Sequence, residues 1–304
     1  MITRPQISFI TVCFNGFKDT CELLDSLITH IHSVTYEIIV VDNASRENEA
    51  LRIKELYPTV ITLKSKFNLG FSGGNNLGIK AAKGQYIFLI NNDTYIESDE
   101  MIYLIELLEN HPKIAAASPK IRFAFSPQNI QFAGFTKLSP ITLRNKGIGY
   151  GQSDNGTFDT PHSIPYLHGA AMIIKREVIH KVGLMPELFF LYYEEIDWSS
   201  SMTRAGYELW YEPRCTIFHK ESQSTGQLSE LRTYYLTRNR LLYARRHLQG
   251  ANLILSIIYQ SIIVASKDCL KYTFLKRYDL TKAVCRGVID GLCTASSDKS
   301  QTNI

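Results

Sequence analysis

The sequence predicts an α/β domain built on a mainly parallel sheet, followed by a helical, basic C-terminal extension. Short, nearly continuous apolar runs alternate with stretches of helical spacing through the first half of the chain. Strands of that kind, separated by helices, indicate a parallel sheet covered on both faces. Basic residues then accumulate towards the C-terminus. We therefore expect an α/β domain over residues 1–225 and the extension over residues 226–304.

The elements follow one another in a regular order up to about residue 90. Predicted strands cover residues 7–14, 37–41, 60–63 and 86–90, with helices at 18–31 and 72–82 and a charged helical stretch between the second and third strands. The glycine- and proline-rich segment 122–165 predicts irregular structure with hairpins and a mobile loop at 147–156. Regular structure is predicted again from residue 166. It consists of an ordered stretch at 166–175, a helix that ends at residue 182, another helix that starts near residue 194, short strands at 208–211 and 215–219, and helices from residue 228 onward.

Charge is divided unevenly between the two parts. Residues 227–304 hold 12 Lys/Arg and 5 Asp/Glu, a balance of +7, so the rest of the +4 chain carries about −3. A basic tail favours an anionic surface or substrate, although a solvated helical face gives the same pattern. Residues 251–265 are apolar but interrupted by polar side chains and shorter than the roughly 18 residues of a membrane span. This segment is expected to be buried, interfacial or dimer-forming.

The six cysteines form no CxxC pair, and no signal peptide is recognised. These features predict reduced structural thiols in a cytoplasmic protein. No nucleic-acid partner is expected.

Polar residues stand where three predicted strands end: Asn15, Asp42 and Asp93. In parallel sheets, ligands bind beyond the carboxyl ends of the strands. Asp42 can accept hydrogen bonds from a nucleotide base or a ribose hydroxyl, or it can form an Asx turn that caps the next helix. Oxygen ligands at Asn91-Asn92-Asp93 suit Mg²⁺ or Mn²⁺, while the alternative is an N-cap for a helix near residue 98.

A glycine-rich loop at residues 68–78 leads into a helix and differs from Rossmann and Walker loops. Its glycines permit close backbone approach, and the helix N-terminus favours anionic groups, although Gly78 also suits tight helix–sheet packing. Further along, Glu194, Glu195 and Asp197 follow an aromatic run. Desolvation there can raise a carboxyl pKa and produce a general base, or the charges can simply complement a helix N-terminus. His219 ends a strand and is either a metal ligand or a structural histidine.

In this order, these segments resemble the family 2 glycosyltransferases of GT-A fold, especially the rhamnosyltransferase-like branch of bacterial polysaccharide assembly. The likeness runs from residue 7 to about residue 247. It includes the segments 11–15, 41–45, 68–78, 89–93, 168–172, 193–198, 205–219 and 235–240.

The resemblance implies an inverting, metal-dependent transfer of sugar from a UDP- or dTDP-sugar to a hydroxyl of a saccharide or lipid-linked saccharide. Asp42 would hold the base, Asp93 and His219 would ligate Mn²⁺ or Mg²⁺, and Glu195 would deprotonate the acceptor. Gly169 would lie near the donor sugar and the acceptor. The full set implied for the donor site is Thr11, Phe14, Asn15, Asp42, Asn68, Gly70, Asn75, Asn91, Asn92, Asp93 and Gly169.

Two departures from the family pattern matter. Asn91 occupies the first position of the family's metal-binding DxD motif, and Ser201 stands where an arginine is usual, with Arg204 one turn later. The second departure leaves Asp197 as another candidate base. The two departures, at Asn91 and at Ser201, support an alternative, which is a non-catalytic nucleotide-sugar-binding protein. A nucleotidyltransferase is a further alternative, but it would need a glycine-rich basic signature near the N-terminus, which residues 11–18 lack.

For the extension, two partners are expected with equal weight. One is the inner face of the cytoplasmic membrane, where the protein would meet a lipid-linked acceptor. The other is a second copy of the chain, through the C-terminal helices.

Overall fold

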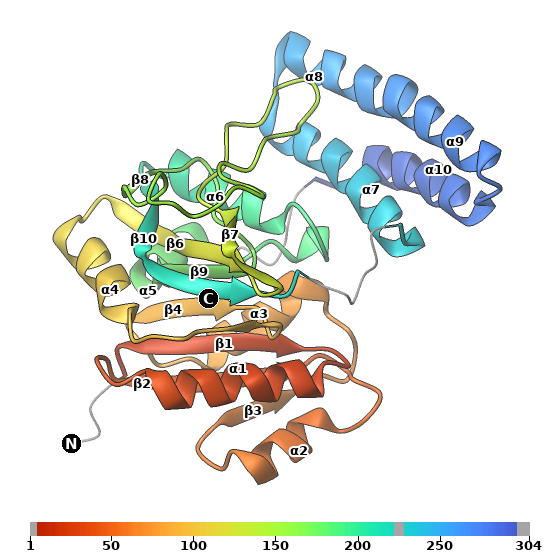
Figure 1. The fold of residues 1–304 in the computed structure, drawn as a ribbon. Helices are drawn as coiled ribbons and strands as arrows, with labels where there is room; N and C mark the ends of the chain where they lie inside the picture. The colour runs from red at the N-terminus through yellow and green to blue at the C-terminus, as the bar shows by residue number, and fades with distance from the viewer. Residues whose placement is uncertain (1–4, 222–227, 297–304) are drawn as a thin grey trace.

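The computed structural model describes residues 5–221 and 228–296. The predicted domain boundary at 225/226 lies outside the described residues. A ten-stranded sheet forms the centre of the molecule, and its main path runs β3-β2-β1-β4-β9-β6-β10-β5. Figure 1 shows this sheet with helices around it and the last helices, α8 to α10, at one side of the molecule.

The first half of the sheet is parallel, as predicted. Its strands are β1 (Ile7–Cys13), β2 (Tyr36–Asp42), β3 (Ile61–Lys64) and β4 (Tyr86–Ile90). The helices α1 (Phe17–His30), α2 (Glu49–Leu56) and α3 (Gly70–Ala81) alternate with them. Every residue of β4 is buried, and all but Val12 in β1, because both faces of these central strands are covered.

The second half adds antiparallel pairs, so the sheet as a whole is mixed. β9 (Ala171–Lys175) runs antiparallel to both β4 and β6 (Ile114–Phe123), and β10 (Glu208–His219) runs parallel to β6. The prediction of two short strands at 208–211 and 215–219 is wrong, since β10 is one strand with an irregularity between Glu212 and Thr216. The short β5 (Thr94–Tyr95) pairs with the end of β10.

Four helical segments complete this part: α4 (Met101–Asn110), α5 (Arg176–Val182), the 3₁₀ turn η1 (Glu187–Phe189) and α6 (Glu194–Arg204). The predicted hairpin region contains β7 (Ser126–Phe132), paired with β6, and β8 (His162–Ser163), paired with β10.

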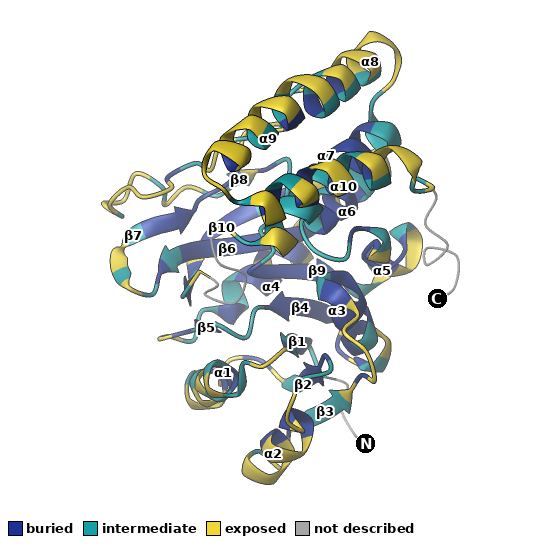
Figure 2. Ribbon diagram, turned by 90° about the vertical axis from the view of Figure 1, so that its right-hand side faces the viewer, coloured by how far each residue is buried: buried dark blue, intermediate teal, exposed yellow. Residues whose placement is uncertain are grey.

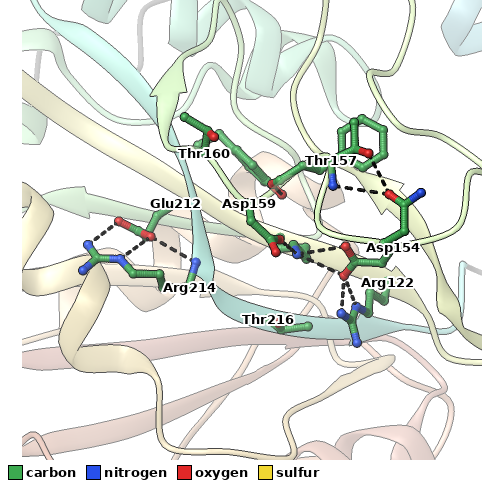
Figure 3. A network of polar contacts seen from close by, with 12 residues as sticks. Arg122, Asp154, Thr157, Asp159, Thr160, Glu212, Arg214 and Thr216 are labelled. Carbon is green, nitrogen blue, oxygen red and sulfur yellow. Dashed lines mark hydrogen bonds and ion pairs between the residues drawn. The ribbon is translucent and has the colours of Figure 1, made fainter.

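The loop predicted to be mobile, residues 147–156, is anchored. Asp154 is buried and accepts hydrogen bonds from Lys120 Nζ at 3.0 Å and from Arg122 Nε at 2.8 Å. Asp159 pairs with the same lysine, and Figure 3 shows Arg122 and Asp159 beside Asp154. Two cations of β6 therefore fix the loop, a long-range contact that its glycine-rich composition did not reveal.

The C-terminal region consists of α7 (Glu230–His247), α8 (Gly250–Ile258), the π-helical segment η2 (Tyr259–Val264), α9 (Ala265–Phe274) and α10 (Tyr278–Cys293). α7 packs against the sheet-containing part through Leu242 and Tyr243, which cluster with Leu143, Phe189 and Tyr193. A separate small core joins α9 to α10 through residues such as Tyr272 and Leu280.

α8, η2 and α9 form one helix from Gly250 to Phe274, 25 residues with a mean hydropathy of 1.5 in its most apolar window. By length and composition this helix is able to cross a membrane, and only 17% of that window is buried. The sequence interpretation stopped the apolar segment at residue 265 and so judged it too short. Of the three alternatives expected for residues 251–265, which were a buried, an interfacial and a dimer-forming helix, burial is wrong.

Candidate active site

Chain direction gathers the predicted site residues at one edge of the sheet. β1, β2 and β4 end there because they are parallel neighbours, and β10 ends there because it runs parallel to β6. β9 runs the opposite way and therefore begins at this edge, where Asn91 N donates to Ala170 O at 2.9 Å. The pairing of β5 with β10 brings Thr94 opposite His219, so Asp93 lies beside that histidine.

Asp93 and His219 form a close pair whose geometry suits a shared cation. His219 Nε2 lies 3.2 Å from Asp93 Oδ1, and both side chains are largely buried. His219 Nδ1 lies 2.8 Å from Gln131 Oε1, a carbonyl oxygen that can only accept, so Nδ1 carries the proton. In the neutral ring Nε2 then presents a lone pair, and it makes no hydrogen bond with the described residues. A lone pair and a carboxylate directed at each other fit a divalent cation.

Within the described ranges, no group of three or more His, Cys, Asp and Glu could hold a metal ion. Asp93 and His219 would therefore supply two ligands, and the remaining positions would fall to phosphate oxygens and water, as is usual for Mg²⁺-type sites.

His168 borders this pair from the start of β9. Its ring centroid lies 6.4 Å from that of His219, and the ring stacks on Phe135 at 5.7 Å. Burial, with a contribution from His219, lowers the pKa of His168 to about 3, so His168 is neutral. A Cβ atom added to the neighbouring Gly169 would meet nothing within 4 Å, so packing does not require glycine at this position.

At the end of β2, Asp42 has the geometry of the Asx-turn alternative. Its Oδ1 accepts from Ser45 N at 2.9 Å and its Oδ2 from Ala50 N at 3.2 Å, and the side chain is fully buried. Direct contact with a base requires this turn to move. Asn15 and Phe14 are exposed beside the turn, and Asn15 Oδ1 accepts from Arg46 N at 2.9 Å. Thr11 is buried within β1, and its Oγ1 has no hydrogen-bond partner among the described residues.

Amide side chains fix the glycine-rich loop. Asn43 Nδ2 donates to Asn68 Oδ1 at 3.1 Å and to Gly70 O at 3.0 Å, while Asn43 Oδ1 accepts from Leu69 N at 2.9 Å. Gly70 has φ +72°, and a Cβ there would lie 2.3 Å from Phe190 O, so only glycine fits. Asn75 bonds back to its own helix at Phe71 O, a structural contact rather than one directed at the edge.

Asn91 and Asn92 differ in their surroundings. Asn92 Nδ2 lies 3.3 Å from Gly16 O and 3.2 Å from Thr20 Oγ1, so it ties the β4 turn to α1. Asn91 is half-buried beside Asp93, at the first position of the motif.

The two glutamates at the start of α6 are distinguished by burial. Glu194 is 3% exposed, and burial together with the charge of Glu195 raises the pKa of Glu194 well above its usual range. Glu195 is half-buried and reachable, and burial raises its pKa to about 7 even though backbone N–H groups at the helix start favour its charged form. Glu195 is therefore the carboxylate suited to take a proton near neutral pH.

A strained turn presents these glutamates. Phe190, Tyr192 and Tyr193 all have positive φ, between 65° and 76°, which is costly for side chains of this size. Asn239 on α7 is fully buried, and its Nδ2 lies 2.8 to 3.0 Å from the carbonyl oxygens of Phe189, Leu191 and Tyr192. The turn is thus held from the C-terminal helix, which sequence reasoning included in its motif without assigning a role.

Asp197, the alternative base, does not fit that role. It is fully buried and accepts from Arg246 Nε at 2.8 Å and His247 Nε2 at 2.5 Å, both on α7. Although burial acts to raise the pKa of Asp197, these hydrogen bonds bring it below its ordinary value. No arginine stands at Ser201, and the cation that pairs with Asp197 is Arg246, supplied by α7. The sequence did not single out Gln131 or Arg246 and gave Asn239 no role, because only the pairing of distant elements reveals these contacts.

A cavity of about 290 Å³ lies elsewhere, between α7, the 138–143 loop and the C-terminal half of α6, and none of its lining residues belongs to the edge described above.

Comparison with known proteins agrees with this geometry. Residues 8–183 match the family described as Glycosyl transferase family 2. The poly-beta-1,6-N-acetyl-D-glucosamine synthase of Staphylococcus epidermidis is 25% identical over 294 residues, covering 89% of this chain and 68% of that protein. The low-salt glycan biosynthesis hexosyltransferase Agl10 of Haloferax volcanii is 23% identical, covering 94% and 91%. The N-acetylglucosaminyl-diphospho-decaprenol L-rhamnosyltransferase of Mycobacterium tuberculosis is 23% identical, covering 62% and 68%.

Solved structures agree on the fold. GalNAc-T7, crystallised with UDP, GalNAc and Mn²⁺, superposes with a TM-score of 0.60 at 16% identity, covering 86% of this chain and 55% of that one. The mannosyltransferase PcManGT of Pyrobaculum calidifontis, in complex with GDP-Man and Mn²⁺, gives 0.55 at 15% identity, covering 97% and 77%. Because the family pattern spans more than half of the sequence, this chain belongs to the family 2 glycosyltransferases.

Proposed function

We propose that the protein transfers a sugar, with inversion, from a nucleoside-diphosphate sugar to a hydroxyl of a saccharide or lipid-linked saccharide in cell-surface polysaccharide synthesis. The observation that carries the proposal is the Asp93–His219 pair. His219 Nε2 lies 3.2 Å from Asp93 Oδ1 at the edge of the sheet where the strands end, and this nitrogen makes no hydrogen bond with the described residues. Relatives named as polysaccharide synthase and rhamnosyltransferase support the substrate class.

Asp93 and His219 would hold Mn²⁺ or Mg²⁺, which would neutralise the charge that develops on the departing diphosphate. Neighbouring structures with Mn²⁺ support this choice of ion. Gln131 would keep the His219 ring in the tautomer that leaves Nε2 free to bind, as second-shell partners of metal-binding histidines commonly do.

The donor would lie along the edge between Asn15 and Gly169. Phe14 and Asn15 would border the base, with Asp42 and Asn43 fixing the turns around it. Open space at Gly169 would leave room for the donor sugar. Glu195 would take the proton of the acceptor hydroxyl as that oxygen attacks the anomeric carbon and the nucleoside diphosphate departs on the opposite side.

The reaction would take place on the cytoplasmic side of the membrane, where nucleotide sugars would meet a lipid-linked acceptor.

The test is release of nucleoside diphosphate from UDP-, dTDP- and GDP-sugars, with Mn²⁺, Mg²⁺ or EDTA. We expect turnover of one donor class, lost with EDTA and in Asp93→Ala, while donor binding in calorimetry weakens in parallel. Glu55→Gln, on the exposed side of α2, is the matched control. Tight binding without turnover, even with acceptor lipids added, would favour the non-catalytic alternative. Metal-independent turnover would contradict the metal role of Asp93 and His219.

A further inference from the structure

The Gly250–Phe274 helix turns polar side chains towards the protein and large apolar side chains outward, the reverse of a surface helix in a water-soluble protein. Its buried positions include Ser256 and Gln260, whereas Ile258, Ile262 and Leu270 point outward at 44%, 59% and 73% exposure. Figure 2 shows α8 and α9 at the periphery, largely exposed along their outer side. Other outward apolar residues of this helix are Ile254, Leu255, Ile263 and Phe274. A helix of this length presents an apolar strip of about 38 Å, far more than isolated surface leucines explain.

We propose that this strip lies flat in the interface of an anionic lipid bilayer. Isoleucine, leucine and phenylalanine side chains leave water there, which is the main source of binding energy for interfacial helices. Exposed Lys267 and Lys271 on α9, with Lys276 just beyond it, would meet the anionic headgroups.

Crossing the membrane is inconsistent with the packing. α8 and η2 contact α7, and α9 contacts α10, so one side of the helix is covered by protein along its length. Gln260 Nε2, on that inner side, donates to the backbone oxygen of Thr142 at 2.8 Å. A spanning helix would have to leave α7 and α10 and take Gln260 into the hydrocarbon without these partners.

A second copy of the chain is a weaker occupant than a bilayer. The described part of the extension, residues 228–296, holds 11 Lys/Arg and 4 Asp/Glu, a balance of +7. On the Gly250–Phe274 helix itself, Lys267 and Lys271 outnumber Asp268, and Lys276 follows, so two copies would bring like charges together, whereas an anionic bilayer offers the opposite charge.

The bond from Gln260 also connects the bilayer to the active site. The loop that it holds, residues 138–143, ends at Leu143, whose oxygen accepts from Tyr193 Oη at 2.7 Å. Tyr193 directly precedes the two glutamates of α6. A helix fixed at the bilayer would thus hold the Glu195 end of the active site at a set position relative to the lipid surface.

The first experiment is co-sedimentation of the full chain with phosphatidylcholine vesicles, with and without phosphatidylglycerol. We expect binding that depends on the anionic lipid and weakens with salt. Replacing two outward residues, Ile258→Glu with Ile262→Glu, should lower the partition coefficient at least about tenfold. Leu51→Glu with Leu56→Glu, which places the same two charges on similarly exposed residues of α2, should bind as the wild type does. Circular dichroism and donor binding confirm that the variants are folded.

The second experiment measures depth through tryptophans introduced singly at Ile254, Ile262 and Leu270, quenched by brominated lipids. A flat helix gives similar, shallow quenching at all three, whereas a spanning helix makes position 262 deepest. Absence of vesicle binding, combined with a wild-type dimer that Ile258→Glu with Ile262→Glu converts to monomer, would overturn the proposal in favour of self-association. None of these readouts requires sugar transfer, so they remain informative if the proposed reaction is wrong.

Discussion

Helices α4 and α8 place their apolar side chains on opposite sides. In α4, Leu104 and Leu108 are buried against the sheet while Glu106 and Glu109 face outward. In α8, Ser256 is buried while Ile254 and Ile258 are exposed. Both helices have one apolar face and one polar face. The apolar face of α4 is buried against the sheet, whereas the apolar face of α8 points away from the protein. The difference teaches that the sheet-containing part is built around its own core, whereas the outer extension leaves an apolar face exposed, the face that we propose lies on a bilayer.

Between these extremes lies α7, which belongs to the extension by sequence and to the active site by contact. Arg246 and Asn239 reach α6 and the turn before it. Substitution of Asn239 tests the contribution of α7 to catalysis, and substitution of Arg246 tests its contribution to stability.

The largest effect is expected from Glu195→Gln, which removes the base while keeping the shape of the side chain. The turnover number should fall about 10²- to 10⁴-fold, with donor affinity nearly unchanged. Steady-state kinetics, with the donor that the nucleoside-diphosphate release assay selects, measures both. Glu194→Gln is the matched control, since burial together with the charge of Glu195 raises the pKa of Glu194 well above its ordinary value and Gln imitates the neutral form. If Glu194→Gln were the inactive variant, the two roles would be reversed.

Arg246→Met should destabilise the fold strongly, because it removes the arginine that pairs with the buried Asp197 carboxylate and leaves only His247 beside it. Breaking a buried ion pair from one side costs about 3–5 kcal/mol of unfolding free energy. Chemical denaturation measures this against Arg52→Met, whose partner Glu47 is exposed and whose pair should contribute about 0–1 kcal/mol. Equal losses in the two variants would show that α7 is not held to α6 by this pair.

Asn239→Ala should reduce turnover roughly tenfold to a hundredfold, since a small displacement of the base is costly. Asn239 touches no reacting atom, and it acts by holding the strained turn before Glu194. A positioning role predicts a lower kcat with little change in the donor KM, whereas a merely structural role lowers only the amount of folded enzyme. Asn252→Ala, exposed on α8, is the control and should be silent.

The pH dependence should be the smallest and most specific effect. Burial raises the pKa of Glu195 to about 7, and the base works only when deprotonated, so kcat should rise with pH through this value and level off above it. Between pH 6 and pH 8 the deprotonated fraction increases about tenfold. The inflection should vanish in Glu195→Gln. A profile that falls over this range would mean that the essential group acts as an acid.

Much of the architecture follows from local pattern. The parallel strands up to β4, the polar residues at their ends and the glutamates of α6 could be located from apolar runs and turn residues, because each depends on neighbours close in sequence. The pairing of Asp93 with His219 was implied by the family likeness, and the β5–β10 contact brings the two side chains together.

Other features depended on contacts that no local pattern encodes. Sequence alone determined that residues 251–265 are apolar and that the C-terminal part is basic. Only the tertiary structure decided that this apolar face points away from the protein, that Arg246 pairs with Asp197, and that Gln131 orients His219. The reason is physical: composition fixes how much apolar surface and charge a segment carries, whereas the packing of distant elements fixes which side chains remain in contact with the surroundings.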